Sequence, residues 1–370
     1  MNDKKIKVCF LHPDVRNVND MLTWLHLKSL PFAENIVFDN ENPDYIFATD
    51  HIYHNLEYAK TFMRLAQKAS IRIYFSGESI TPDLNIFDYA IAFDKKLSDM
   101  DRITSMPANI FWTNLITRTE NELTSQEEAK SLLQERKRFC NFIYSNRGAH
   151  PNRDKLFHTI SAYKHVDSLG RHLNNIGALI TYKKGGISWS ELSRMIKSKY
   201  KFSIASENAR YEGYTSEKLL TSFEAHTVPI YWGNPYVAEE FNSEAFVNCM
   251  DYESFDEVVK RVKEIDEDDD LWAYMVSRQW QTNEQKKSSE QLLVRYLRFM
   301  ENIFTQPVTL AKRRPEGTFT RIYERWFFQR KYYNPSRLSM IFTAPSVLLS
   351  RLKNKFTYKR EIDIHDFFKD

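Results

Sequence analysis

Short runs of β-branched and aromatic residues recur along the chain and alternate with stretches whose apolar positions repeat at helical spacing. The first predicted strands are Ile6–Leu11, Tyr45–Thr49, Ile71–Ser76 and Tyr89–Phe93. Four more follow at Phe139–Tyr144, Phe202–Ala205, Val228–Trp232 and Phe246–Asn248. The predicted helices are Asn55–Lys68, Asp154–Tyr163, Trp189–Lys197, Ser216–Ala225 and Phe255–Lys263. This alternation predicts an α/β protein built around parallel sheets.

The strands fall into two groups separated by a polar stretch, Arg118–Arg138, which is rich in Glu, Gln, Lys and Ser. We therefore expect two α/β domains facing each other across a cleft, over residues 1–135 and 136–305. Such sheets bind ligands at the carboxyl ends of their strands. Residues 306–370 form a third segment, a C-terminal tail. The acidic run Glu264–Asp270 is expected to be a solvated surface loop.

The composition is that of a folded protein in a reducing compartment. Hydrophobic residues make up 42% of the 370 residues, which is too many for a disordered chain. The three cysteines, Cys9, Cys140 and Cys249, are too few and too scattered for a disulfide framework. The first residues contain no apolar run of signal-peptide length, and no stretch approaches the roughly 20 apolar residues of a membrane span. We expect a cytoplasmic protein.

Charge is distributed unevenly along the chain. Between Ala311 and Arg360, 13 Lys and Arg face only two Glu, so this part carries +11, whereas the whole chain carries +3. Apolar side chains interleave with the charges at helical spacing: Ile322, Tyr323, Trp326 and Phe327, then Leu348, Leu352 and Phe356. A basic, aromatic, amphipathic tail favours an anionic membrane surface and hence a peripheral location on the inner membrane. The alternative is that the apolar stripe packs on the rest of the protein. No nucleic-acid-binding module accompanies the tail, so nucleic acid is not an expected partner.

The common nucleotide and metal motifs are missing from the sequence. It contains no GxGxxG, no Walker A motif, no HExxH and no zinc-type cysteine spacing. Asp99-Met100-Asp101 and Asp268-Asp269-Asp270 could in principle hold a metal, but acidic runs are usually solvated and neither follows a convincing buried strand. We expect no metal site.

The richest stretch is Tyr200–Asn234, YKFSIASENARYEGYTSEKLLTSFEAHTVPIYWGN. A predicted strand ends in Ser206-Glu207-Asn208, and Glu217-Lys218 begins a helix after a polar, aromatic loop. The free N–H groups at a helix start favour phosphate, Lys218 adds positive charge, and Glu217 can accept hydrogen bonds from ribose. The alternative is an ordinary helix start with a surface lysine.

This stretch resembles the signature of the α-1,3-fucosyltransferases, glycosyltransferase family 10. The matching positions are Lys201, Phe202, Glu207, Asn208, Tyr214 to Leu219, Phe223 and Val228 to Gly233. Two further segments agree, YFSGESITPDLNIFDYAIAFD at Tyr74–Asp94 and YSNRGAHPNRDKLF at Tyr144–Phe157. The resemblance covers roughly Lys5 to Met300. Ala209-Arg210 and the loop before Arg153 depart from the usual pattern, which affects loop contacts.

The resemblance implies a GT-B arrangement of two Rossmann-like domains facing a cleft, and an inverting transfer of L-fucose from GDP-β-L-fucose. The N-terminal domain would bind the acceptor, and residues 136–305 would bind GDP-fucose. Arg153 and Lys218 would neutralise the diphosphate, Glu217 would bind the ribose, and Asn208 and Tyr214 would line the nucleotide region. Glu78 matches the proposed general base, although it could also be a turn residue before Thr81-Pro82.

The acceptor implied is O3 of N-acetylglucosamine, or glucose, in N-acetyllactosamine-type oligosaccharides or lipid-linked glycans, for Lewis-type epitopes on lipopolysaccharide or another surface glycan. No cofactor is expected to be essential, with Mn²⁺ or Mg²⁺ at most stimulating. Two alternatives stay open. One is a GT-B transferase that uses another nucleotide sugar, and the other is a non-catalytic, membrane-associated protein that binds GDP or glycans.

Overall fold

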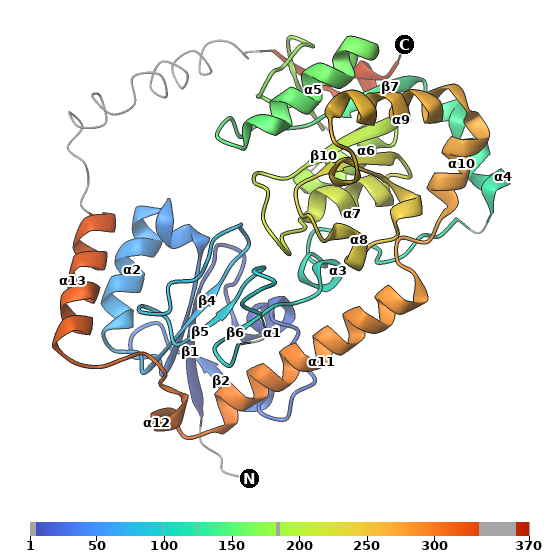
Figure 1. Cartoon of the computed structure of the whole chain (residues 1–370). Helices are drawn as coiled ribbons and strands as arrows, with labels where there is room; N and C mark the ends of the chain where they lie inside the picture. Colours follow the sequence, from blue (N-terminus) through green and yellow to red (C-terminus); the bar gives the residue numbers. More distant parts are fainter. Residues whose placement is uncertain (1–4, 99, 124, 183–185, 333–359, 370) are drawn as a thin grey trace. The chain divides into compact units, whose positions relative to one another are not determined.

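The computed structural model describes residues 5–98, 100–123, 125–182, 186–332 and 360–369. The chain folds into two compact units (Figure 1). The first unit is Met1–Pro107 with Ser288–Asn334, and the second is Ala108–Lys287 with Pro335–Asp370. These ranges differ from the expected 1–135, 136–305 and 306–370, because the chain returns to the first unit after Lys287 and its last residues join the second.

The first unit contains a six-stranded parallel sheet in the order β2-β1-β3-β4-β5-β6. Its strands are β1 (Ile6–Leu11), β2 (Ile36–Phe38), β3 (Tyr45–Thr49), β4 (Ile71–Phe75), β5 (Tyr89–Ile91) and β6 (Ile103–Thr104). Its helices are α1 (Val18–Trp24), α2 (Leu56–Ala66), most of α11 (Asn283–Thr305), α12 (Val308–Ala311) and α13 (Thr318–Tyr332).

Successive strand residues point to opposite faces of this sheet, and each face has its own helices. Cys9 and Ile46 pack with Phe62 of α2 and Phe327 of α13, and these two helices lie side by side in Figure 1. On the other face, the Phe47 ring stacks on Phe304 of α11 at 6.3 Å. Both faces are therefore covered, as is usual for parallel sheets.

The second unit contains a five-stranded parallel sheet in the order β12-β11-β10-β7-β8. Its strands are β7 (Arg138–Phe142), β8 (Val166–Ser168), β10 (Tyr200–Ser206), β11 (Val228–Trp232) and β12 (Val247–Asn248). Its helices are α3 (Ala108–Phe111), α4 (Gln126–Ser131), α5 (Pro151–Tyr163), α6 (Trp189–Lys197), α7 (Glu217–Glu224), α8 (Val237–Glu240), α9 (Phe255–Glu267) and α10 (Asp269–Ser277). Helices α5, α9 and α10 share a core with β7, β10 and β11, whereas α6 and α7 contact β10 separately.

The order in which the strands are added to the sheet reverses between the neighbouring strands β7 and β10. After β7 the chain adds β8 on one side, and then β10, β11 and β12 on the other. Such a reversal leaves a crevice at the carboxyl ends of the two central strands, where open α/β sheets bind ligands. The topology therefore points to the loops after β7 and β10 as the site to inspect.

A two-stranded parallel sheet joins the end of the chain to the second unit. Strand β13 (Glu361–Asp363) pairs with β9 (Leu179–Thr181). The short helix α16 (Ile364–Phe367) follows, and Ile364 packs in a small core with Ile180 and Ile196.

The fold class predicted from the sequence is confirmed, with parallel sheets in both units. All eight predicted strands are present, with ends shifted by at most two residues. Five short strands were not predicted: β2, β6, β8, β9 and β13. Each has only two or three residues, which is too short for the hydrophobic pattern to distinguish it from a loop.

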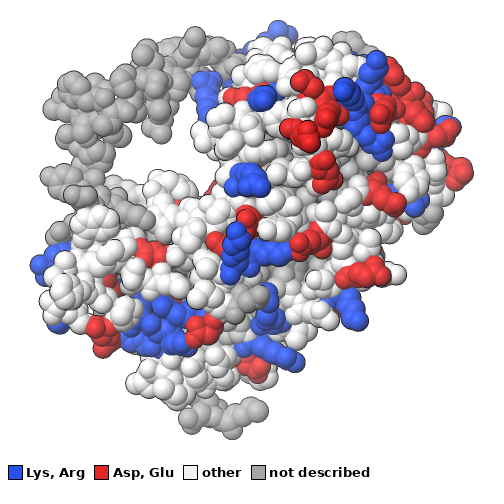
Figure 2. Space-filling view, in the orientation of Figure 1, with Lys and Arg blue, Asp and Glu red and all other residues white. Residues whose placement is uncertain are grey.

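The acidic run Glu264–Asp270 is not the loop that its composition suggests. Glu264–Glu267 is the last turn of α9, and the Asp268 side chain accepts hydrogen bonds at the start of α10. Acidic side chains gather over this part of Figure 2 beside several basic ones. Ile265 within the run is buried on α9, and ion pairs join the run to other segments, since Lys164 lies 2.8 Å from Asp266 and Lys130 lies 2.6 Å from Asp270.

The described parts of the basic tail contact the protein through only a few buried side chains, and the four apolar residues expected on one face of a helix are divided between the core and the surface. On α13, Phe327 is buried and Tyr323 packs beside it, whereas Ile322 is 55% exposed and Trp326 is 48% exposed. The reason is that α13 covers the first sheet with one side only. The basic residues are also used in the fold: Arg314 forms a buried ion pair with Asp88. The repeat Leu348, Leu352 and Phe356 lies outside the described residues.

Within the described residues, no helix combines the length and the apolar character needed to cross a bilayer. The three cysteines are buried and unpaired with one another.

Candidate functional site

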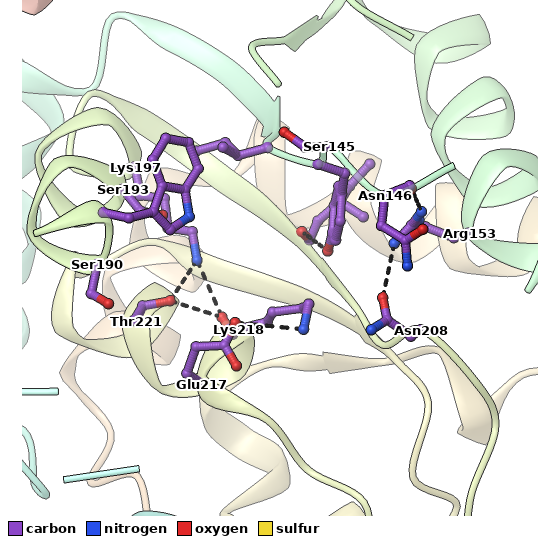
Figure 3. Close-up of a pocket in the computed structure, with 14 residues that line it drawn as sticks. Ser145, Asn146, Arg153, Ser190, Ser193, Lys197, Asn208, Glu217, Lys218 and Thr221 are labelled. Atoms are coloured by element: carbon purple, nitrogen blue, oxygen red, sulfur yellow. Dashed lines mark hydrogen bonds and ion pairs between the residues drawn. The ribbon is translucent and has the colours of Figure 1, made fainter. Parts of the chain in front are cut away.

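A cavity of about 250 Å³ opens in the second unit between β7 and β10, at the crevice expected from the strand order (Figure 3). The loop after β7 contributes Tyr144 to Asn146, and the loop after β10 contributes Asn208. Helices α5, α6 and α7 contribute Arg153, Lys197 and Lys218. In Figure 3, Arg153 lies with Asn146 and Asn208 on one side, and Lys197, Ser193 and Ser190 lie on the other.

Arg153 is a buried cation that faces this cavity. Its side chain projects from the first turn of α5, the residue is 1% exposed, and its guanidinium carbon lies 4.5 Å from the centre of the Tyr144 ring. Its guanidinium donates to Asn208 Oδ1 at 3.2 Å and to the Asn146 carbonyl. Among the described residues no carboxylate forms an ion pair with it, and its Nε has no hydrogen-bond partner. Burial lowers the pKa of Arg153, so an anion in the cavity would relieve a real cost.

Lys218 lies at the start of α7 between two carboxylates. Its Nζ is 3.4 Å from Glu207 Oε2, 3.5 Å from Glu217 Oε1 and 3.0 Å from Ser216 Oγ. These contacts hold the ammonium group at the cavity wall, where Glu217 also lies. An ammonium group beside a carboxylate could bind a ligand that carries an anionic group next to hydroxyl groups, because the ammonium attracts the anion and the carboxylate accepts hydrogen bonds from the hydroxyls.

Glu207 fixes the position of this helix start. Its carboxylate is fully buried and accepts hydrogen bonds from the Ser216 N–H at 2.7 Å and the Ser216 hydroxyl at 2.6 Å. Burial raises the pKa of Glu207, while Lys218 opposes that rise. In the sequence Glu207 was part of the motif but had no assigned role. In the structure it positions Lys218, through the ion pair with its Nζ and through Ser216.

Lys197 is a third cation at the cavity, and the sequence did not single it out. Its Nζ donates to the Lys218 carbonyl at 3.2 Å, Thr221 Oγ1 at 2.7 Å and Ser222 Oγ at 3.0 Å. These three contacts fasten α6 to the first turns of α7. Burial lowers the pKa of Lys197 to about 7. In the sequence it resembles its neighbours Lys199 and Lys201, so only its burial distinguishes it.

Two predicted site residues lie elsewhere. Tyr214 is 2% exposed and does not line the cavity; its carbonyl accepts a hydrogen bond from the Tyr231 hydroxyl at 3.4 Å. Glu78 belongs to the first unit, where it follows β4 on an exposed turn. The structure thus brings Arg153, Asn208, Glu217 and Lys218 to one cavity, and leaves Tyr214 and Glu78 outside it.

The turn that carries Glu78 is held firmly. Asp50 Oδ2 accepts from the Gly77 N–H at 2.6 Å, and Asp50 Oδ1 accepts from the Tyr74 hydroxyl. The Ser76 hydroxyl donates to the Glu78 carbonyl at 2.7 Å. Burial raises the pKa of Asp50. These hydrogen bonds hold the backbone around Glu78 at the end of a parallel strand, the edge where such sheets bind ligands.

No cluster of three or more His, Cys, Asp or Glu suited to a metal ion occurs in the described parts of the chain. Of the acidic runs considered above, Asp268 is a helix cap and Asp270 is paired with Lys130, while Asp99 is not among the described residues.

Comparisons with known proteins identify relatives of this chain. Residues 133–305 match the model for the C-terminal part of glycosyltransferase family 10 (fucosyltransferase), and residues 25–112 match the N-terminal domain of α-(1,3)-fucosyltransferase FucT. The α-(1,3)-fucosyltransferase FucT of Helicobacter pylori is 28% identical over 54% of this chain and 45% of its own length. A putative fucosyltransferase of Acanthamoeba polyphaga mimivirus is 26% identical over 56% of this chain and 33% of its own. The chain therefore spans less than half the length of these relatives.

Solved structures resemble the whole fold. A crystal structure of an α1,3-fucosyltransferase with GDP-fucose superposes with a TM-score of 0.58 at 23% identity, covering 83% of this chain and 92% of that one. The corresponding complex with GDP gives a TM-score of 0.55 at 22% identity, covering 80% and 91%. At this identity the likeness establishes the fold, two Rossmann-like units of the GT-B class. Together with the two domain matches, it shows that the chain belongs to glycosyltransferase family 10, the fucosyltransferases.

Proposed function

We propose that the protein transfers L-fucose from GDP-β-L-fucose to a sugar hydroxyl, with inversion at the anomeric carbon. One observation carries the proposal. The buried Arg153 guanidinium, which has no carboxylate partner among the described residues, shares a cavity with Lys218 at the switch point of the second sheet. This is the arrangement that a departing nucleoside diphosphate requires.

In such a transfer the bond from the fucose carbon to the diphosphate breaks, and negative charge grows on the leaving oxygen. Arg153 would meet it with a planar fork and Lys218 with a point charge. Asn208 keeps the Arg153 guanidinium in place through its Oδ1, and Glu217 would accept hydrogen bonds from the ribose hydroxyls. Because protein cations carry this charge, the proposed mechanism has no step that needs a metal. Activity should survive EDTA; a loss of activity that Mn²⁺ or Mg²⁺ restores would contradict it.

The donor half is tested with Arg153→Ala and Lys218→Ala. Each should lower turnover with GDP-fucose about 100- to 1,000-fold while leaving the circular dichroism spectrum unchanged, since each removes a cation from the leaving group. Lys199→Ala is the matched control, because this lysine is nearby in sequence and 40% exposed. Near-normal turnover in either site variant would refute the assigned roles.

Glu78 is the proposed general base, which would take the proton from the acceptor hydroxyl as the new bond forms. Its support is the rigid turn fixed by Asp50 at the end of β4. Glu78→Gln should reduce transfer about 100- to 10,000-fold. Binding of GDP, measured by calorimetry, should persist because the donor cavity lies in the other unit. Retained transfer would place the base elsewhere.

We propose O3 of N-acetylglucosamine or glucose in N-acetyllactosamine-type glycans as the acceptor, with Lewis-type surface glycans such as lipopolysaccharide as the setting. The support is the similarity to an α-(1,3)-fucosyltransferase over about half of this chain. An acceptor screen with GDP-fucose, in which NMR identifies the product linkage, tests it. A donor panel separates this function from a transferase of another nucleotide sugar, and tight GDP binding without any transfer would indicate a non-catalytic protein.

We also propose a peripheral association with an anionic membrane surface. Its support is a stripe on α13 formed by Phe319, Ile322 and Trp326, which are 87%, 55% and 48% exposed. Arg321 and Arg325 on the same helix are exposed beside them. Aromatic side chains with flanking cations suit the interface of an anionic bilayer.

A further inference from the structure

A second cavity of about 420 Å³ adjoins the one just described, because Ser145 and Trp189 line both. Alone, the first cavity is smaller than the roughly 300–1,000 Å³ that ligand sites usually occupy. A nucleoside diphosphate held at Arg153 and Lys218 therefore has room to extend past Trp189 into the second cavity. Trp189 begins α6 and is 57% exposed, which leaves much of its indole surface available for stacking.

The end of the chain builds one wall of this second cavity. Glu361 lines it from β13, opposite Leu179 of β9. Two contacts of the adjoining helix α16 anchor this strand. Ile364 is buried, and the Arg138 guanidinium carbon lies 4.5 Å from the centre of the Phe367 ring. The C-terminal segment is thus a part of the second unit's fold, placed beside the donor cavity.

Two opposite charges face the second cavity. Arg171 and Glu361 both line it, and neither side chain has a hydrogen bond or an ion pair with another described residue. A diphosphate would be repelled by the Glu361 carboxylate, whereas Arg153 and Lys218 attract it at the other end. The base of the nucleotide is consequently the part that fits here.

We propose that Glu361, delivered by the C-terminal strand, reads the guanine base of the donor, with Trp189 stacking on it and Arg171 facing its other edge. Guanine offers two adjacent donors, N1–H and the 2-amino group, to a carboxylate, and the acceptors O6 and N7 to a guanidinium. Adenine has an acceptor at N1, and uracil is too small to present both edges. The pair therefore selects guanine, and this inference rests on the proposed use of a GDP-linked donor.

Inosine diphosphate, which lacks only the 2-amino group, isolates the contact. Titration calorimetry on the full chain should show GDP binding about 10- to 100-fold more tightly than inosine diphosphate. The Glu361→Gln variant should bind GDP nearly as weakly as it binds inosine diphosphate. Its affinity for inosine diphosphate should differ from that of the wild type by less than about threefold. Trp189→Ala should weaken both nucleotides about tenfold and equally, since stacking does not depend on the amino group.

Asp366→Asn is the matched control on the same segment, because Asp366 is exposed and pairs only with Lys369 among the described residues; it should leave both affinities unchanged. An unaltered ratio of GDP to inosine diphosphate affinity in Glu361→Gln would overturn this inference. If GDP binding is still lost in Lys218→Ala, the proposed function survives that result. Failure of the wild-type protein to bind GDP would overturn both.

Discussion

Replacing Lys197 with Met should change how the stability of the second unit depends on pH. Lys197 is fully buried beside α7, and burial lowers its pKa from the ordinary 10.5 to about 7. Between these two pH values the unfolded chain holds a proton that the folded protein lacks. The free energy of unfolding contributed by this group therefore rises with pH, and the full cost of burying the charge is felt below pH 7.

The size of the effect follows from the same two values. Each pH unit in this window is worth about 1.4 kcal/mol once the folded form is mostly neutral, so from pH 7 to pH 9 the gain is about 2 kcal/mol. Met removes the titration together with the hydrogen bonds to Thr221 and Ser222. The stability of the wild type relative to Lys197→Met should accordingly rise with pH, by about 2 kcal/mol between pH 7 and pH 9.

Urea denaturation followed by tryptophan fluorescence, at half-unit steps of pH, measures this difference. The core tryptophans Trp272 and Trp280 both belong to the second unit and report its unfolding. Lys199→Met serves as the control, because its side chain is 40% exposed, and its difference from the wild type should not vary with pH. If the free energies of unfolding of the wild type and Lys197→Met change in parallel with pH, the reasoning that burial lowers the pKa of Lys197 is refuted.

Further predictions concern the core and the surface. Arg314→Met should destabilise the first unit by about 3–5 kcal/mol in urea denaturation, because it leaves the fully buried Asp88 carboxylate without its ion-pair partner; a loss under 1 kcal/mol would contradict this. Gly233→Ala should abolish turnover or folding, since an added Cβ would lie 2.4 Å from Glu207 Cγ at a φ of +157°, and wild-type activity would show that the loop can shift. Trp326→Ser should weaken binding to anionic vesicles in a sedimentation assay at least fivefold, as about 1 kcal/mol or more of interfacial burial is lost; unchanged binding would exclude α13 as the contact.

The tail illustrates how far composition could lead. Its aromatic spacing predicted a helix with Ile322, Tyr323, Trp326 and Phe327 on one face, and the helix α13 is present although these side chains do not share one face. The helix nevertheless turns Phe327 into the core and leaves Trp326 half exposed, because the apolar face of the first sheet needed a cover. An apolar stripe in the sequence indicates that its side chains will be buried, but it does not indicate which surface they will be buried against.

The pattern along the chain by itself predicted the α/β class and eight of the strands, and the family motif pointed to Arg153, Glu217 and Lys218 as candidate site residues, because periodicity and an ordered motif are local properties. Tertiary structure alone decided the rest. The strand order placed the cavity between β7 and β10, and burial turned Lys197 and Glu207 from ordinary charged residues into supports of α7. Pairing with β9 brought Glu361 from a distant part of the sequence to the second cavity, which adjoins the one lined by Arg153 and Lys218. Contacts between residues so distant in sequence depend on packing and on the desolvation of charge, which no local pattern records.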